Sequence, residues 1–346
     1  MPPTEPMIAA LPKVELHCHI EGTMRPGTVA DLASAHGIAL PVDDPNDLYR
    51  YGNLTEFLAV FWLVQSTLVD REAWSRLAYE SIVDGAVHGL VHRETFFTPA
   101  RHLVAGQSLA DIVAGIDEGL SLAERETGVT ARLIFDIDRD FGGAVGLDHV
   151  EQLVALLRTD APGAERVIGV GMDSTELGVD PASFTDAYRV AAGAGLHLTG
   201  HQGENSPASA AATAIDVLGL ERLDHGFSVM EDPALVARLA ERRLPFTLCP
   251  NANVRINPDL FTEVAQHPFD AMRDAGLLVT LNTDDPALID LDLTQEYRLT
   301  ADAFGYSWDD LVELSTNAVE ACWLDDADKR ALRRRVVDGA TSTTSD

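Results

Sequence analysis

Lysine is almost absent from this chain, which contains only Lys13 and Lys329. A Walker-type phosphate loop needs a lysine inside a glycine-rich motif, and an enzyme that works through a Schiff base needs a lysine nucleophile. Neither lysine stands in such a sequence context. The sequence therefore argues against both classes of protein.

Basic residues as a whole are also few. The chain has 25 lysines and arginines against 55 aspartates and glutamates, which gives a formal net charge of −30. Such a charge repels polyphosphate backbones and anionic lipid surfaces, so we expect neither a nucleic-acid nor a membrane partner. Most of this charge is expected to form a solvated surface, but it also disfavours strongly anionic substrates.

Cysteines and long apolar runs are scarce as well. Cys18, Cys249 and Cys322 are too widely separated to form a disulfide framework, and the first residues lack the basic and apolar segments of a secretory signal. The longest apolar stretch, FLAVFWLV at residues 57–64, is far shorter than the roughly 20 residues that span a bilayer. We therefore expect a reduced, cytoplasmic protein without a membrane span.

Short apolar runs typical of buried strands recur eight times along the chain. They lie at residues 13–19, 91–97, 131–138, 167–173, 196–201, 222–225, 245–249 and 277–282. The intervening segments with helical periodicity include residues 108–126, 184–194, 207–218, 233–242 and 267–275. Alternating strands and helices favour an α/β fold, and eight such units predict a single (β/α)8 TIM-type barrel.

No linker or low-complexity block divides the sequence, so residues 1–346 are predicted to form one domain. The segment between the first two strands, about residues 20–90, is too long for a single crossover. We expect it to place extra helices over the mouth of the barrel. Residues 308–337 are predicted to form C-terminal helices.

His17 and His19 stand two positions apart at the end of the first predicted strand. Because side chains alternate along a strand, both imidazoles point to the same side, as metal ligands do. A lone histidine is more often structural. We interpret the following isolated histidines in that way: His36, His88, His92, His102, His149, His197 and His267.

Further polar groups follow later strands, in the segments HQGE (residues 201–204), DHG (224–226) and NTDDP (282–286). In a (β/α)8 barrel these strand ends converge at one mouth. Imidazoles together with a carboxylate suit zinc, which can acidify a bound water in an open coordination position. The combination of four strand ends favours a metal-dependent hydrolase over isolated turn and capping residues.

These motifs resemble those of the adenosine/adenine deaminase family, in the same order along the chain. The resemblance is carried by LPKVELHCHIEGTMRP at residues 11–26, by HQGE, by ERLDHG at 221–226 and by LNTDDP at 281–286. It extends through VHRETFFTPARH (91–102), GVGMDSTELG (169–178) and LDDADKRAL (324–332), and so covers nearly the whole chain. The motifs are closest to those of bacterial adenine deaminases.

The resemblance implies one zinc ion per chain, bound by His17, His19, His201 and Asp284. Three further side chains would take part in the reaction. Glu204 would protonate the ring nitrogen beside the attacked carbon, His225 would orient and polarise the zinc-bound hydroxide, and Asp285 would bond to the imidazole edge of the purine. A tetrahedral intermediate would then expel ammonia.

Other positions are expected to shape the substrate pocket. By resemblance, Ser174 and Glu176 lie where relatives hold the far edge of the purine, while Phe61 and Trp62 belong to a helix that covers the mouth. Apolar residues at helical spacing are more often plain core. Glu21 stands where adenosine deaminases usually carry Asp, and its extra methylene moves the carboxylate roughly 1.5 Å further into the ribose space. This favours the free base.

Related zinc enzymes provide the nearest alternatives. Cytidine-type deaminases use H-x-E followed by P-C-x-x-C, and the reversed order Cys249-Pro250 excludes them. Two-metal relatives usually bridge their metals with a modified lysine at the fourth strand, where this chain has none. A non-catalytic purine or metal binder would have no need of Glu204 and His225.

Two departures from the family pattern lie near the mouth. Gln202 replaces the usual alanine of the HxGE element, and Asn251 and Ala252 replace more common residues after the seventh strand.

Taken together, the motifs predict a zinc-dependent hydrolytic deaminase of a small 6-aminopurine, either adenine or an N6-substituted adenine. Adenosine or an unusual aminopurine stays open as a substrate, and so does a homo-oligomeric state.

Overall fold

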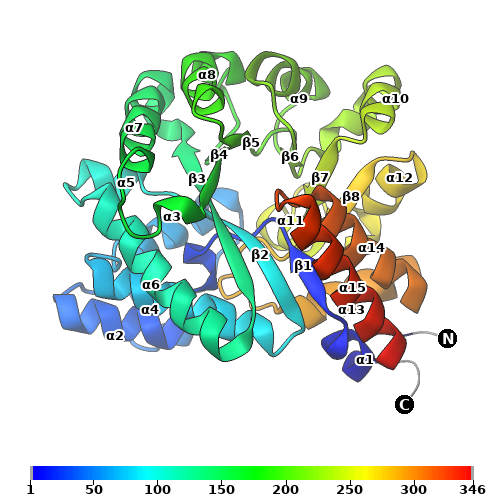
Figure 1. The fold of residues 1–346 in the computed structure, drawn as a ribbon, viewed down its shortest axis with the longest axis horizontal. Coiled ribbons are helices and arrows are strands. Elements are labelled where there is room, and N and C mark those ends of the chain that lie inside the picture. Colours follow the sequence, from blue (N-terminus) through cyan, green and yellow to red (C-terminus); the bar gives the residue numbers. More distant parts are fainter. Residues whose placement is uncertain (1–2, 344–346) are drawn as a thin grey trace.

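The computed structural model describes residues 3–343, with eight parallel strands at the centre and helices around them (Figure 1). The strands are β1 (Lys13–Glu15), β2 (Leu90–Phe97), β3 (Thr130–Asp138), β4 (Val167–Asp173), β5 (His197–Leu198), β6 (Leu223–Asp224), β7 (Pro245–Leu248) and β8 (Leu278–Leu281). Parallel ladders join β1 through β5 in one run and β6 through β8 in a second. Each strand falls within or beside a run predicted from the sequence.

Two isolated bridges join these runs into a closed barrel. His201, beyond the end of β5, pairs with Asp224, the last residue of β6, and Cys18 pairs with Asp284 just beyond β1 and β8. At the second closure the backbone N–H of His19 donates to the carbonyl of Asp284 over 2.9 Å. The predicted (β/α)8 architecture is thus confirmed, and both closures are made by residues next to or within the predicted site.

Three helices lie between β1 and β2, where the sequence predicts an insertion: α2 (Pro26–His36), α3 (Leu54–Gln65) and α4 (Arg71–Ala86). The C-terminal helices are α14 (Trp308–Ala321) and α15 (Asp326–Thr343). The other helices are α1 (Glu5–Ala10), α5 (Ala100–Val104), α6 (Leu109–Thr127), α7 (Gly142–Leu157), α8 (Thr185–Gly193), α9 (Ala208–Thr213), α10 (Pro233–Arg242), α11 (Pro250–Ile256), α12 (Phe269–Asp274) and α13 (Leu293–Phe304). A π-helical turn, Ala214–Leu218, extends α9.

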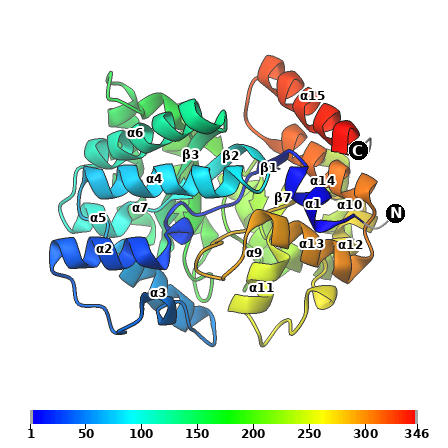
Figure 2. The same cartoon turned by 90° about the horizontal axis from the view of Figure 1, so that it is seen from below.

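Helix α3 covers the end of the barrel that carries the site. Its N-cap is Asn53, whose side chain accepts a hydrogen bond from the backbone N–H of Glu56. Its Phe57 and Phe61 pack with Ile256 of α11 in a separate apolar cluster. Figure 2 shows α3 and α11 at one end of the barrel and α15 at the other. Burial of these aromatic rings, rather than the barrel ladder, holds α3 in place.

At the opposite end, one of the two lysines has a structural role. Lys13 is buried, and its ammonium group donates to the backbone carbonyls of Ile8, Leu11 and His88. Burial lowers the pKa of Lys13 to about 7.

Among the described residues, no helix combines the length and apolarity needed to cross a membrane.

Candidate active site

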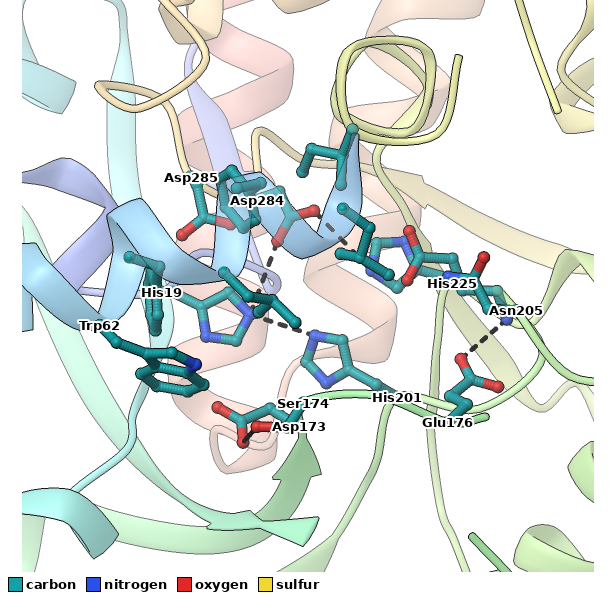
Figure 3. Close-up of a pocket in the computed structure, with 16 residues that line it drawn as sticks. His19, Trp62, Asp173, Ser174, Glu176, His201, Asn205, His225, Asp284 and Asp285 are labelled. Atoms are coloured by element: carbon teal, nitrogen blue, oxygen red, sulfur yellow. Dashed lines mark hydrogen bonds and ion pairs between the residues drawn. The ribbon is translucent and has the colours of Figure 1, made fainter. Parts of the chain in front are cut away.

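Four of the predicted metal ligands converge at the closure of the barrel. The Nε2 atom of His201 lies 3.1 Å from Nε2 of His17 and 3.1 Å from Nε2 of His19. Oδ1 of Asp284 lies 3.2 Å from Nε2 of His17 and 3.5 Å from Nε2 of His19. Ligands at about 2.0–2.1 Å from a tetrahedral zinc ion are separated by about 3.3 Å. The side chains therefore fit one zinc ion. Figure 3 shows three of them, His19, His201 and Asp284, which point toward one another.

His225 stands on the other side of Asp284. Its Nε2 atom lies 3.8 Å from Oδ2 of Asp284, whereas His17 and His19 both face Oδ1. His225 also belongs to a buried group with His17, His201 and Asp284 whose candidate ligand atoms lie within 4.8 Å of one another. His225 thus faces Oδ2 of Asp284, the oxygen that the predicted histidine ligands do not face. This position suits contact with a water molecule or a substrate better than binding of the metal ion.

The electrostatics of this cluster suit a cation. Burial lowers the pKa of His19 to about 3 and also lowers that of His201, so both imidazoles are neutral. Burial opposes charge on Asp284 too, but His17 outweighs it and holds the pKa of this carboxyl well below its usual range. The same pair raises the pKa of His17 despite its burial. His19, His201 and Asp284 are thus in the protonation states that bind metals, a neutral imidazole or an ionised carboxylate.

Hydrogen bonds behind the cluster orient two of the imidazoles. Nδ1 of His201 lies 3.0 Å from the carbonyl of Met172, which can only accept, so Nδ1 carries the hydrogen. The hydroxyl of Thr247 donates to Oδ1 of Asp224 over 2.7 Å and lies 2.9 Å from Nδ1 of His17. Since its single hydrogen goes to Asp224, the hydroxyl accepts from His17. Both histidines thus present an unprotonated Nε2 to the metal position.

Backbone conformation also directs these side chains. His225 (φ 56°) and Ser174 (φ 70°), directly after β6 and β4, and Asp284 (φ 67°), which forms the bridge to Cys18, adopt the left-handed region. For residues other than glycine this conformation is uncommon and costs free energy, and it concentrates at functional sites. Here it turns each side chain out of the strand direction and toward the mouth of the barrel.

Glu204 lies beside the metal cluster, on the loop after β5. Its Oε1 atom accepts hydrogen bonds from the side-chain amides of Asn253 and Asn257, each over 2.7 Å. Burial raises the pKa of Glu204, with like charge on Glu176 and Asp284 adding to the effect. A glutamate with a raised pKa can hold a proton closer to neutral pH, as a general acid must.

Asp285, which follows the predicted ligand Asp284, points into the same cavity. Its Oδ1 atom is buried and has no hydrogen-bond partner within the described residues. Burial and the neighbouring Asp284 raise its pKa. A Cβ atom on Gly22 would lie 2.0 Å from this Oδ1, so the glycine of the HCHIEG motif makes room for the carboxyl group. Asp285 is also one of the residues that line the cavity, where its carboxyl group can reach a ligand.

The space between these groups, including the part that is open to solvent, is about 540 Å³. Its polar floor contains His19, His201, His225, Asp284, Asp285, Glu204, Asp173, Ser174, Glu176 and Asn205. Its apolar wall contains Leu54, Phe57, Leu58, Phe61, Trp62 and Ile256. Phe61 and Trp62 thus lie at the cavity, as the sequence predicts, and they belong to the helix over the mouth. An apolar wall opposite a polar floor is typical of a small-molecule site.

Glu176 lines this cavity, but its carboxylate is bonded to the protein. It accepts from the backbone N–H groups of Gly203 (2.7 Å) and Glu204 (3.0 Å). It also accepts from the side-chain amide of Gln202 (3.0 Å) and from the hydroxyl of Ser206. Glu176 therefore holds the loop that carries Glu204, and Gln202, the departure from the family pattern, is one of its donors. Its predicted contact with substrate stays a prediction.

Glu21 is fully buried and is not among the residues that line the cavity. Its Oε1 atom accepts from the backbone N–H of Thr98 over 2.8 Å and from the Gln65 amide over 3.2 Å. Burial raises its pKa to about 7. The structure thus places Glu21 behind the residues that line the cavity, and its predicted contact with a substrate stays a prediction.

Several residues at the site were not singled out from the sequence. They are Asp173, Asn205, Asn253, Asn257 and Ile256. Asp173 is the last residue of β4, and that position was a signal that could have identified it. Asn253 and Asn257 stand four positions apart, the spacing that places two residues on one face of a helix. The sequence offers no comparable signal for Asn205 or Ile256.

A parallel (β/α)8 barrel with a buried imidazole–carboxylate cluster beside a glutamate of raised pKa defines a metal-dependent hydrolase. A sequence model described as adenosine deaminase matches residues 12–339, and the chain belongs to this family.

Individual relatives agree with this assignment. The chain is 37% identical over 326 residues to an adenine deaminase from Streptomyces coelicolor, which covers 93% of each chain. It is also similar to the crystal structure of an adenine deaminase from Arthrobacter aurescens, with 32% identity, a TM-score of 0.89 and coverage of 96% and 99%. An amidohydrolase from Burkholderia ambifaria, solved with bound zinc, has 32% identity, a TM-score of 0.87 and coverage of 99% and 95%.

Proposed function

We propose that this chain is a zinc-dependent deaminase that hydrolyses the exocyclic amine of a 6-aminopurine, with adenine or an N6-substituted adenine as substrate. The observation that carries the proposal is that Glu204 and Asp285 line one cavity together with His201 and Asp284, two members of the buried imidazole–carboxylate cluster. The adenine deaminases among the relatives support the choice of substrate.

One zinc ion would be held by His17, His19, His201 and Asp284, whose facing atoms lie 3.1–3.5 Å apart. When bound, zinc supplies Lewis-acid chemistry that makes a water molecule nucleophilic near neutral pH. The protein supplies the orientation, because each of His17 and His201 has its Nδ1 hydrogen committed to a partner behind the cluster.

Glu204 moves the proton in this reaction. It donates to the ring nitrogen beside the amine-bearing carbon, which makes that carbon more electrophilic, and its raised pKa keeps the proton available. His225 faces the reacting carbon from the other side of Asp284 and polarises the attacking water. Asp285, whose Oδ1 has no protein partner, bonds to the imidazole edge of the purine. The water oxygen adds to the carbon and the bond from carbon to the exocyclic nitrogen breaks. One proton of the water leaves with the amine, and the other replaces the proton that Glu204 gave to the ring nitrogen.

The cavity favours an uncharged substrate. Its described lining contains the carboxyl groups of Asp173, Glu176, Glu204, Asp284 and Asp285, and neither lysine nor arginine. A phosphate group would meet unfavourable charge there. Phe61 and Trp62 of α3 are placed to cover the ring of the substrate, and Ser174 lines the same cavity beside Asp173 (Figure 3). We therefore favour a base over a nucleotide, with adenosine as the second candidate because Glu21 leaves the cavity itself unobstructed.

We further propose that residues 1–346 act as one catalytic domain, with the helices of residues 20–90 as its cover. We place the protein in the cytoplasm, because its three cysteines are buried and unpaired thiols.

The decisive assay is formation of hypoxanthine. Adenine yields hypoxanthine and ammonia, an N6-alkyl adenine yields hypoxanthine and an alkylamine, and adenosine yields inosine. We expect the purified zinc-loaded protein to produce hypoxanthine from adenine or from N6-methyladenine. Absence of turnover with every member of an aminopurine and nucleoside panel would refute the proposed function.

A further inference from the structure

His267 is a buried histidine that the sequence assigns to no function, and its hydrogen bonds determine its tautomer. The backbone N–H of Phe269 donates to its Nδ1 atom over 3.1 Å. Burial lowers the pKa of His267 to about 3, so the ring is neutral and carries one hydrogen. Because a backbone N–H can only donate, Nδ1 is the acceptor and the hydrogen lies on Nε2.

That hydrogen sets the orientation of Asn253. Nε2 of His267 lies 3.1 Å from Oδ1 of Asn253. Because His267 donates here, the oxygen of the Asn253 carboxamide faces His267 and its nitrogen faces the other way. The nitrogen donates to Oε1 of Glu204 over 2.7 Å. The direction of every bond from Phe269 to Glu204 therefore follows from one backbone donor.

Asn257 completes the arrangement around the same oxygen. Its amide donates to Oε1 of Glu204 over 2.7 Å, so this oxygen accepts two hydrogen bonds. Two donors favour negative charge on Oε1 and disfavour a proton there. When Glu204 is protonated, its proton is directed to Oε2, the oxygen left for the substrate.

We propose that His267 and Asn253 are positioning residues that direct the catalytic proton of Glu204 to Oε2. The inference rests on the proposed role of Glu204 in deamination. The ring of His267 is held between Phe227 and Phe261, with ring centroids 5.2 Å and 5.1 Å away. A series of hydrogen bonds thus runs from the backbone of Phe269, at the start of α12, through the side chains of His267 and Asn253 to Glu204.

The first test compares two replacements of His267. In His267→Gln the amide nitrogen occupies the place of Nε2 and still donates to Asn253, whereas His267→Leu fills the space without a donor. We expect His267→Leu to lower kcat for adenine about tenfold or more, because misorientation of a general acid reduces the rate of proton transfer. KM should stay within about threefold, and His267→Gln should keep kcat within about threefold of wild type.

His149 on α7 supplies the matched control, because it is also buried and lies away from the cavity. His149→Leu should leave kcat unchanged. Asn253→Ala should reproduce the loss caused by His267→Leu, and the double variant should be no slower than Asn253→Ala within about threefold, because both changes remove one pathway. Zinc content and thermal unfolding of each variant report on the fold.

A second measurement is independent of turnover. Long-range ¹H–¹⁵N NMR of the histidine-labelled protein, with the His267→Gln variant used for assignment, should show His267 as the Nε2–H tautomer. An Nδ1–H tautomer, equal kcat for His267→Gln and His267→Leu, or wild-type kcat for Asn253→Ala would overturn the inference. If the wild-type protein deaminates no aminopurine, the proposed function fails, while the NMR spectrum still decides whether the hydrogen-bond chain exists.

Discussion

Thr247→Val tests the hydrogen bonds that orient His17. The Thr247 hydroxyl lies 2.9 Å from Nδ1 of His17 and donates to Asp224 over 2.7 Å, and all three side chains are fully buried. Valine has nearly the same shape as threonine but lacks the hydroxyl. The substitution therefore removes both hydrogen bonds while it leaves the packing of β7 intact.

The expected loss of zinc affinity follows from the polar atoms that the substitution leaves buried without a partner. Nδ1–H of His17 loses its acceptor and Oδ1 of Asp224 loses a donor, and an unsatisfied buried polar group costs about 1–3 kcal/mol. Loss of a hydrogen-bonded partner behind a metal ligand typically lowers metal affinity about 10–100-fold. We therefore expect zinc affinity to fall by that factor, which corresponds to about 1.4–2.7 kcal/mol.

The assay is competition for zinc with a chelator of known affinity, followed at constant pH. Thr247→Ser keeps the hydroxyl and should retain affinity within about threefold. Thr300→Val is the matched control, because the Thr300 hydroxyl is equally buried but has no hydrogen-bond partner within the described residues. Equal zinc affinity for Thr247→Val and wild type would refute the assigned hydrogen-bond directions.

Three further predictions concern the cavity. Glu204→Gln should retain zinc and fold but lose about 10²–10⁴ in kcat, as measured by hypoxanthine formation, and wild-type turnover would remove Glu204 from its role. Glu176→Gln places an amide against N–H donors of the Glu204 loop, so we expect kcat to fall about tenfold or more at unchanged zinc content. An unchanged kcat would show that the hydrogen bonds from the Glu204 loop to Glu176 are not needed for activity. Because the similarity to adenine deaminases favours a free base, the ratio of kcat/KM for adenine, or an N6-substituted adenine, to that for adenosine should be at least about ten in steady-state assays, and a ratio of one or less would contradict this preference.

The barrel could be predicted because its determinants are local. Strand-length apolar runs alternate with amphipathic helices, and their number alone indicates closure. The structure adds that closure depends on single bridges, such as that between Cys18 and Asp284. Strand β1 ends at Glu15, so His17 and His19 lie beyond the regular ladder. Their imidazoles still reach one point, since the bridges on either side continue the strand direction.

The environment of the side chains could not be predicted in the same way. The residue that follows a strand can turn toward the mouth or behind it, and backbone torsion decides which. Glu21 begins a 3₁₀ turn and bonds to Thr98, so its carboxylate lies behind the cavity wall. Glu176 bonds to a loop 27 residues away at Gly203. Such partners are distant in sequence and carry no periodic signal.

The role proposed for His267 could not be predicted from the sequence either. An isolated histidine beside a proline gives no sign of function, and the structural interpretation was the reasonable one. Its importance arises from Asn253, 14 residues earlier, and from the backbone N–H of Phe269. Only the packing of α11 against the loop before α12 brings these groups together.

The central claim, zinc-dependent deamination of a 6-aminopurine, is tested most directly by one titration. The metal-free protein is reconstituted with increasing zinc, and hypoxanthine formation from adenine and from N6-methyladenine is recorded. The account predicts no activity without metal and a linear rise that ends at one zinc per chain, because the cluster closes a single site. Full activity of the metal-free protein, or no hypoxanthine from either substrate at one zinc per chain, would contradict it.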